Sequence, residues 1–234
     1  MIRWVEKHRP QTIAEMVMPE RIRSRFLGFT TAGHMPHLLL VGPSGLGKTT
    51  LARALAHERP DLDLVELNGS TEGRLEDVRG DISDLLLGSR LPIFNDTLLL
   101  IDEADYMSDA AQAALRKVLE DTPHTVILTA NQGDKILPAI QSRCAVIDFG
   151  HEFQADRGNK IVGFTARLKT ILAGEGFEAA DEAMLMAFVE QKFPDFRAVL
   201  NEIQLVMMPP VKERESRVAA RQKRGRGCEL INRP

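Results

Sequence analysis

One segment constrains this chain more than any other: residues 42–49 read Gly42-Pro43-Ser44-Gly45-Leu46-Gly47-Lys48-Thr49 and match the pattern GxxxxGK[ST] of phosphate-binding loops. Glycines let a backbone wrap closely around an anion and aim N–H groups at phosphate oxygens. In such a loop, Lys48 adds a positive charge between the β- and γ-phosphates, and Thr49 offers its hydroxyl to Mg²⁺. We therefore expect this loop and the adjacent Thr50 to bind ATP with Mg²⁺.

The surroundings of the loop indicate an α/β fold. Short apolar, β-branched runs alternate with helical patterns, which favours a parallel sheet with helices on its faces. The sequence predicts five strands, at about 37–42, 63–68, 97–102, 125–130 and 145–149. It predicts helices at about 48–58, 76–87, 108–121 and 135–141, with Ser108 as the N-cap of the third. We expect residues 1–150 to form a nucleotide-binding α/β domain.

The pattern changes after Gly150. Three helical stretches, at about 155–174, 181–192 and 195–208, predict a small three-helix lid domain over residues 151–210. The tail, 211–234, holds eight Lys or Arg and three Glu, which gives a local charge of +5. It is poor in apolar residues, so we expect it to be disordered, either as a solvated tail or as an arm that contacts DNA.

Two acidic residues follow the apolar run Leu98-Leu99-Leu100-Ile101. Four apolar residues place Asp102 at the carboxyl end of a buried strand, the edge at which open α/β sheets bind ligands. Asp102 would hold Mg²⁺, usually through water, and Glu103 would polarise the attacking water.

Three further residues are candidates for catalysis. Asn131 ends the predicted strand at 125–130 and could reach the γ-phosphate or the attacking water; the alternative is a turn residue. Arg143 precedes the last strand, too far from its own nucleotide, and could act on a neighbouring subunit's ATP as an arginine finger; the alternative is a surface arginine. Arg197 begins the last helix and could close on the γ-phosphate; the alternative is an ordinary first-turn ion pair.

Composition excludes several functions. No apolar run reaches the ~18–20 residues that span a bilayer, and the N-terminus lacks the apolar segment of a signal peptide, so we expect a cytoplasmic protein, in the host if viral, with no membrane partner. Two distant cysteines and six scattered histidines form no disulfide framework or zinc pattern. Aromatic residues make up only 5% of the chain, so we do not expect it to bind nucleic acid by base stacking. The net charge of −3 does not itself indicate a polyanion partner, and any nucleic acid is expected to be bound through its backbone.

In the order of these elements the chain resembles the AAA+ clamp-loader family. It is similar to replication factor C small subunits and, more closely, to the ATPase subunit of tailed-phage clamp loaders. The Ser-Arg-Cys element is the most specific. The resemblance covers roughly residues 3–205 and rests on Trp4-Val5-Glu6-Lys7-His8-Arg9-Pro10, Pro36-His37-Leu38-Leu39-Leu40, the loop 42–49, Asp102-Glu103-Ala104-Asp105, Ala111-Gln112-Ala113-Ala114-Leu115-Arg116, Asn131, Ser142-Arg143-Cys144 and Phe193-Pro194-Asp195-Phe196-Arg197.

The resemblance implies an AAA+ P-loop NTPase that works with other clamp-loader subunits in a pentameric ring. Such a ring hydrolyses ATP at subunit interfaces, opens a sliding clamp and loads it onto primer–template DNA. By resemblance, Arg9 and Pro10 line the adenine pocket, with His8 where the family usually has Tyr. Gln112 and Arg116 lie on the helix that couples the DNA and nucleotide sites.

Two arginines are implied to contact DNA. Arg79 matches a family position on DNA phosphates, and Arg74 is a second candidate; the alternative for both is a solvated helix face.

One departure from the family concerns assembly. Family members usually carry a third, C-terminal collar domain that holds the pentamer together, and here only the basic tail follows the second domain. We therefore expect the collar to be absent or the chain to be truncated or frame-shifted. Two other functions stay open: a nucleotide- or DNA-binding module without loader activity, and another AAA+ machine that processes DNA.

Overall fold

A computed structural model describes residues 2–32, 34–70, 96–177 and 181–207 of the chain. Three of the predictions lie outside these ranges: the helix at 76–87, the DNA-contacting arginines Arg74 and Arg79, and the basic tail at 211–234.

Five parallel strands form one sheet with the order β2-β3-β4-β1-β5. This confirms the predicted α/β class with a parallel five-stranded sheet. Each strand lies within one residue of its predicted bounds. The strands are β1 (Leu38–Val41), β2 (Leu62–Asn68), β3 (Asp96–Asp102), β4 (Thr125–Ala130) and β5 (Ala145–Asp148).

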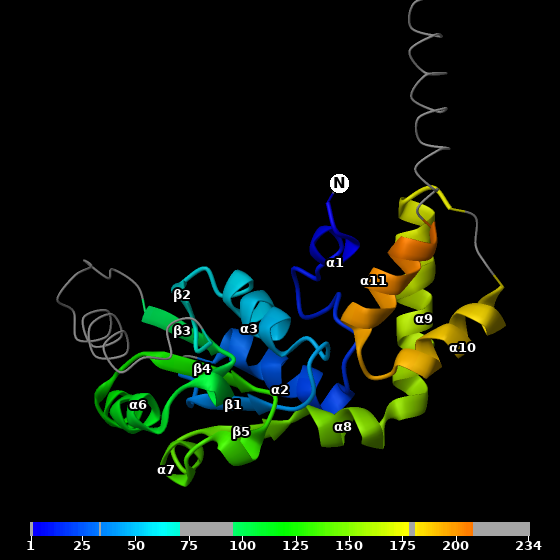
Figure 1. Ribbon diagram of the computed structural model, residues 1–234. Coiled ribbons are helices and arrows are strands. Elements are labelled where there is room, and N and C mark those ends of the chain that lie inside the picture. The colour runs from blue at the N-terminus through cyan, green and yellow to red at the C-terminus, as the bar shows by residue number, and fades with distance from the viewer. Residues whose placement is uncertain (1, 33, 71–95, 178–180, 208–234) are drawn as a thin grey trace, which may run out of the picture.

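Apolar residues on the central strands alternate between two cores, because successive side chains of a strand point to opposite faces. Leu38 and Leu40 pack with α2 (Glu20–Thr31) and α3 (Lys48–His57). Leu39 packs on the other face with α6 (Asp109–Asp121) and α7 (Pro138–Gln141). In Figure 1 the sheet accordingly lies between α3 on one side and α6 and α7 on the other. Burial on both faces explains why these strands read as continuous apolar runs.

Strand register fixes which loops meet. Val41 pairs with Ala130 and Ile101 pairs with Leu128, so the ends of β1, β3 and β4 reach the same edge of the sheet. The segments that follow these strands are therefore neighbours, although they are far apart in sequence.

A group of helices stands beside the sheet (Figure 1). It contains the three predicted helices, observed as α9 (Arg157–Gly174), α10 (Glu182–Lys192) and α11 (Phe196–Met207), which we call the lid helices. The helix α8 (Phe149–Ala155) leads into them from β5. The domain boundaries at 150 and 210 stay predictions.

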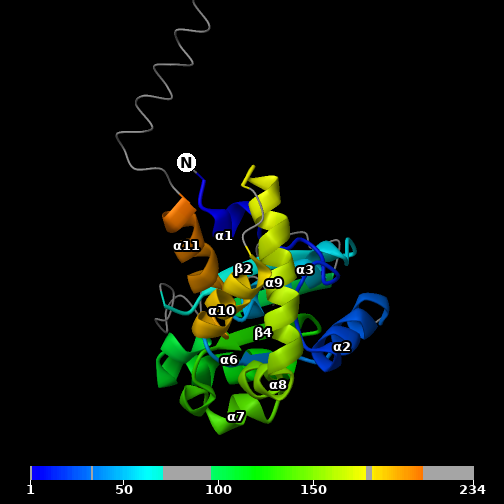
Figure 2. The same cartoon turned by 90° about the vertical axis from the view of Figure 1, so that its right-hand side faces the viewer.

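The N-terminus reaches across to the lid helices. In Figures 1 and 2 the short helix α1 (Trp4–Lys7) lies beside α11. The backbone N–H of Trp4 donates to Oε1 of Gln204 at 2.9 Å, and the indole of Trp4 is buried. The first residues of the chain are thus packed against the last described helix.

Some local structure differs from the prediction. The helix predicted at 135–141 is a 3₁₀ turn at Gly133–Lys135 followed by the four-residue α7. Pro138 begins α7, and the residue before a proline avoids the helical region, so Leu137 is extended (φ −55°, ψ 136°) and separates the two. Helices α1, α2 and α8 were not predicted. Ser108 does cap α6, because its side chain accepts the Ala111 N–H at 3.2 Å.

Within the described ranges, none of the helices combines the length and the apolar character that a bilayer span requires.

Candidate nucleotide-binding site

The loop at 42–47 joins β1 to α3 and turns through two left-handed glycines near its end. Gly45 has φ +82° and Gly47, the N-cap of α3, has φ +87°. A side chain at either position would be strained. A Cβ on Gly45 would also lie 2.0 Å from Oδ1 of Asp195, just before α11. The loop therefore lies directly against Asp195, close enough that only glycine fits at position 45, and α3 begins at the end of this loop.

Lys48 is the central cation of this site and is 7% exposed. Its Nζ donates to the carbonyl oxygens of Gly42 (2.6 Å) and Pro43 (2.9 Å) and to Oδ1 of Asn131 (3.1 Å). Burial lowers the pKa of Lys48 to about 8, against the opposing effect of the nearby carboxylate of Asp102. The ammonium is thus held at the mouth of the loop by groups from two neighbouring strand ends.

A carboxylate and two hydroxyls meet beside Lys48. Oδ1 of Asp102 accepts hydrogen bonds from the hydroxyls of Thr49, at 2.7 Å, and Thr129, at 2.5 Å. Oxygen ligands of this kind suit Mg²⁺, which usually takes one or two carboxylates and completes its shell with water and phosphate oxygens. Among the described residues no group of three or more His, Cys, Asp or Glu side chains forms an all-protein metal cage. The residues present therefore fit Mg²⁺ shared with a nucleotide.

Glu103 follows Asp102 in an unusual backbone conformation. It is the one described non-glycine residue with a positive φ, at 58°. Its N–H donates to the hydroxyl of Thr129 at 3.1 Å, which ties this turn to β4. Such strained conformations are often kept at functional sites, where the surroundings hold them. The turn sets Glu103 next to Asp102 and within electrostatic range of Lys48.

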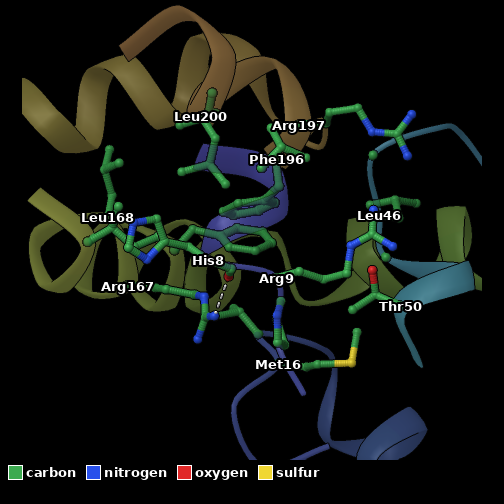
Figure 3. A pocket seen from close by; sticks show the side chains of 18 residues that line it. His8, Arg9, Met16, Leu46, Thr50, Arg167, Leu168, Phe196, Arg197 and Leu200 are labelled. Atoms are coloured by element: carbon green, nitrogen blue, oxygen red, sulfur yellow. Dashed lines mark hydrogen bonds between the residues drawn. The ribbon is translucent and has the colours of Figure 1, made fainter. Parts of the chain in front are cut away.

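A largely apolar cavity of about 120 Å³ adjoins the loop (Figure 3). Its walls come from the N-terminal segment, the phosphate-binding loop with the start of α3, and helices α9 and α11. It includes the predicted Arg9, Pro10, Thr50 and Arg197. The lining is Val5, His8, Arg9, Pro10, Met16, Val17, Gly45, Leu46, Gly47, Thr50, Phe164, Arg167, Leu168, Ile171, Phe196, Arg197, Val199 and Leu200.

Arg197 connects this cavity to the phosphate-binding loop. It is exposed, and its charge is one of those that lower the pKa of Lys48, so the two cations share one electrostatic environment. The mutual repulsion of two like charges favours an anion between them.

Arg143 lies away from these residues. It precedes Ala145, which pairs with Leu38 at the start of β1, whereas the phosphate-binding loop follows the end of β1. Its guanidinium donates to the carbonyl of Ala139 at 2.5 Å and to the carboxylate of Glu120. The hydrogen bond from Arg143 lowers the pKa of Glu120, with a smaller contribution from Arg116. The structure does not bring Arg143 to the nucleotide site of its own chain.

The two predicted coupling residues differ in their surroundings. Gln112 is buried at the start of α6, donates to the carbonyl of Lys135 at 3.0 Å and accepts the N–H of Leu137 at 2.9 Å. It thus joins α6 to the segment that follows Asn131. Arg116 is half-exposed and bonds Glu120 at 3.3 Å. The roles of all these site residues stay predictions.

Sequence reasoning missed several pocket residues, above all Arg167 on α9. Arg167 donates to the carbonyls of Glu15, at 2.7 Å, and His8, at 3.0 Å. Met16 and Val17 line the same cavity. An arginine on an otherwise amphipathic helix carries no sequence signal that separates it from a solvated side chain, so only the three-dimensional contacts identify it.

Comparison with known proteins identifies relatives of this chain. Residues 38–150 match the family described as "ATPase family associated with various cellular activities (AAA)". The sliding-clamp-loader large subunit of Enterobacteria phage T4 is 35% identical over 202 residues, covering 85% of this chain and 62% of that protein. The replication factor C small subunit of Thermofilum pendens is 39% identical over 214 residues, covering 86% and 61%. The chain thus spans about three fifths of the length of the curated relatives it matches.

Solved structures agree on the fold. The Thermotoga maritima RuvB Holliday junction branch migration motor matches with a TM-score of 0.59 at 18% identity, covering 83% of this chain and 63% of that one. The sequence comparisons, in turn, show that the chain contains a domain of the AAA family of ATPases and is related, over most of its own length, to sliding-clamp-loader and replication factor C subunits.

Proposed function

We propose that this chain is an ATPase subunit of a clamp loader, which hydrolyses ATP with Mg²⁺ to open a sliding clamp and load it onto primer–template DNA during replication. One observation carries the proposal: the consecutive residues Lys48 and Thr49, at the end of a phosphate-binding loop, bond Asn131 and Asp102 from the ends of two other strands. The names of the relatives support the choice of a loader among the machines that use this fold.

Each residue of the group has a chemical task in this proposal. The loop N–H groups and Lys48 bind the phosphates, and Thr49 and Asp102 would hold Mg²⁺. When bound, Mg²⁺ neutralises charge on the β- and γ-phosphates. Glu103 accepts a proton from the attacking water, and Asn131 orients that water or the γ-phosphate. Arg197 reaches the same phosphate from the lid helices.

Other residues of the proposal act beyond the chain's own nucleotide. Arg143 supplies a guanidinium to the ATP of an adjacent subunit, where it stabilises charge on the transferring phosphoryl group. Arg74 and Arg79 bind DNA phosphates. Gln112 and Arg116 couple DNA binding to the nucleotide site through α6. The adenine base enters the cavity beside Arg9 and Pro10.

ATP turnover, measured with and without primer–template DNA and a sliding clamp, tests the proposal. We expect DNA and clamp each to raise the turnover rate. Lys48→Ala serves as the control, because it removes the cation at the phosphates and should abolish tight ATP binding. Turnover that neither DNA nor clamp stimulates would contradict the loader function and leave a nucleotide-binding module or another DNA-processing ATPase.

A further inference from the structure

Arg167 lines the cavity and bonds two separate carbonyls of the N-terminal segment. It lies in the middle of α9 and directs its guanidinium at the N-terminal segment, as Figure 3 shows. Nη2 donates to the carbonyl of His8 at 3.0 Å, and Nη1 donates to the carbonyl of Glu15 at 2.7 Å. One side chain therefore holds both ends of the segment 8–15.

The segment held in this way forms a wall of the cavity. Arg9 and Pro10 lie between the two bonded carbonyls and line the cavity, and Met16 follows directly. Between α1 and α2 the backbone contains turns and bends, without a helix or strand to fix it. Its shape therefore depends on side-chain bonds from its neighbours.

The opposite side of the segment is attached to the α/β body. The N–H of Ile13 donates to Oε1 of Glu58 at 2.7 Å, and Arg23 donates to the carbonyl of Ile13 at 2.9 Å. Arg167 is the counterpart of these contacts on the lid helices. The segment is consequently fixed between the two parts of the molecule, and the cavity lies where they meet.

Arginine is chemically suited to this position. Its planar guanidinium offers donors on two nitrogens, so that it can bond two carbonyls at once, whereas the ammonium of lysine acts as a point charge. Burial lowers the pKa of Arg167, and the charge of Glu15 partly offsets this effect. An arginine stays charged at physiological pH, and a partly buried charge needs hydrogen-bond partners. The two carbonyls provide them.

We infer that Arg167 is a positioning residue for the base pocket: it fixes residues 8–15 as the wall against which the base of a purine nucleoside triphosphate packs. The inference rests on the nucleotide binding in the proposed function. It assigns Arg167 no contact with the phosphates, which the loop and Lys48 bind. Loss of Arg167 therefore weakens the binding of the base and spares the binding of the triphosphate group.

Isothermal titration of the full chain with two probes, ATP and inorganic triphosphate, each with Mg²⁺, tests the inference. For Arg167→Ala we expect the Kd of ATP to rise by about tenfold, the equivalent of one hydrogen bond to a charged group, with the Kd of triphosphate unchanged. Arg167→Lys should lie between the alanine variant and the wild type, since it can bond one carbonyl.

Lys160→Ala provides a matched control. Lys160 is also on α9 and donates to the carbonyl of Met18 at 2.8 Å, but it does not line the cavity. This variant should leave both dissociation constants within about twofold of the wild type, a change of under half a kcal/mol. A general effect of loosening α9 would instead appear in both variants.

Two results would overturn the inference: an unchanged Kd for ATP in Arg167→Ala, or an equal weakening of ATP and triphosphate. If the alanine variant does not fold, the same pair of probes applied to Arg167→Lys decides between these outcomes. A wild-type chain that binds no ATP would refute the proposed function itself, and is thus distinguished from a failure of this inference alone.

Discussion

The two edges of the sheet carry different chemistry. At the carboxyl edge, Lys48 bonds Asn131 and the adjacent Thr49 bonds Asp102, which brings together segments at the ends of three strands. At the amino edge, Arg143 lies on the short α7–β5 connection, and its guanidinium bonds groups of that edge, among them the carbonyl of Ala139 and the carboxylate of Glu120. Side chains from several strands meet at the first edge, whereas Arg143 lies at the second, away from them.

The length of the strands explains what this difference means. Leu38 and Val41 bound β1, so about 10 Å of strand separates the two edges at roughly 3.3 Å per residue. A guanidinium at the amino edge cannot serve a phosphate on its own loop at that distance. The contrast supports the proposal that each chain binds one nucleotide and contributes Arg143 to another.

The largest effect is expected for Arg143→Ala, which tests whether the amino edge acts on the nucleotide of another chain. We expect turnover to fall by about 10³-fold with ATP affinity unchanged, because the arginine acts in the transition state of a neighbouring site. Mixing this variant with Lys48→Ala should restore part of the activity, since the latter keeps Arg143.

Arg157→Ala is the control for Arg143. Arg157 also pairs with a glutamate, Glu190 at 3.2 Å, but on the surface of the lid helices. Its replacement should leave turnover near the wild-type value. Undiminished turnover in Arg143→Ala, or no recovery on mixing, would count against catalysis between chains.

The second largest effect is expected at the carboxyl edge, from Glu103→Gln. The amide keeps the size of the side chain but cannot accept a proton, so turnover should fall by at least about 100-fold while ATP binding persists. Single-turnover rates measure the loss of hydrolysis, and the Kd of ATP measures binding.

Glu66→Gln serves as the control. It removes a carboxylate on the outer strand β2 that pairs with Arg53. Turnover retained by Glu103→Gln would exclude the proposed base.

A pH measurement sharpens the comparison at Lys48. Its pKa of about 8 means that the free site loses its ammonium as the pH rises above 8, whereas bound phosphate favours the charged form. ATP binding should therefore take up a proton at pH 9 and very little at pH 7, and the Kd should rise by up to about tenfold per pH unit above 8. Titration calorimetry in buffers of different ionisation enthalpy measures this uptake. Equal proton uptake at both pH values would refute the assignment.

The smallest effect is expected at the amino edge, at His37. Burial lowers the pKa of this imidazole, whose Nε2 bonds the carbonyl of Leu119 at 3.1 Å while its Nδ1 accepts the N–H of Val126 at 3.1 Å. Below pH ~6.5 the unfolded chain binds a proton that the folded chain resists, so the free energy of unfolding falls as the pH decreases.

Urea denaturation checks the His37 prediction. Between pH 7.5 and 5.5 the free energy of unfolding of the wild type should fall further than that of His37→Gln, which does not titrate at this position. An identical loss in both proteins would show that other groups cause the acid sensitivity.

Much of the carboxyl edge was predictable, because parallel strands place their ends together and each of Lys48, Asp102 and Asn131 directly follows an apolar run or a glycine-rich loop. The base pocket was predictable only in part. Arg9 and Pro10 came from resemblance, whereas Arg167 depends on contacts with residues more than 150 positions earlier.

The local errors have local physical causes. Leu137 precedes a proline and so interrupts the predicted helix at 135–141. Helix α2 has no side-chain cap and contains Gly28, which weakens its sequence signal, and it forms because Ile22 and Phe26 are buried against the sheet. Packing energy of this kind cannot be read from local propensity.

The contact between Gly45 and Asp195 has a consequence for mutational studies. Because a Cβ at position 45 would overlap Oδ1 of Asp195, a residue that also caps α11 through the Ala198 N–H at 2.9 Å, any replacement there acts as a wedge between loop and helix. The effect measured for an alanine at position 45 would then combine two losses, the change in the loop backbone and the displacement of Asp195. Shortening the side chain at 195 in the same protein would relieve the overlap and allow the two losses to be measured separately.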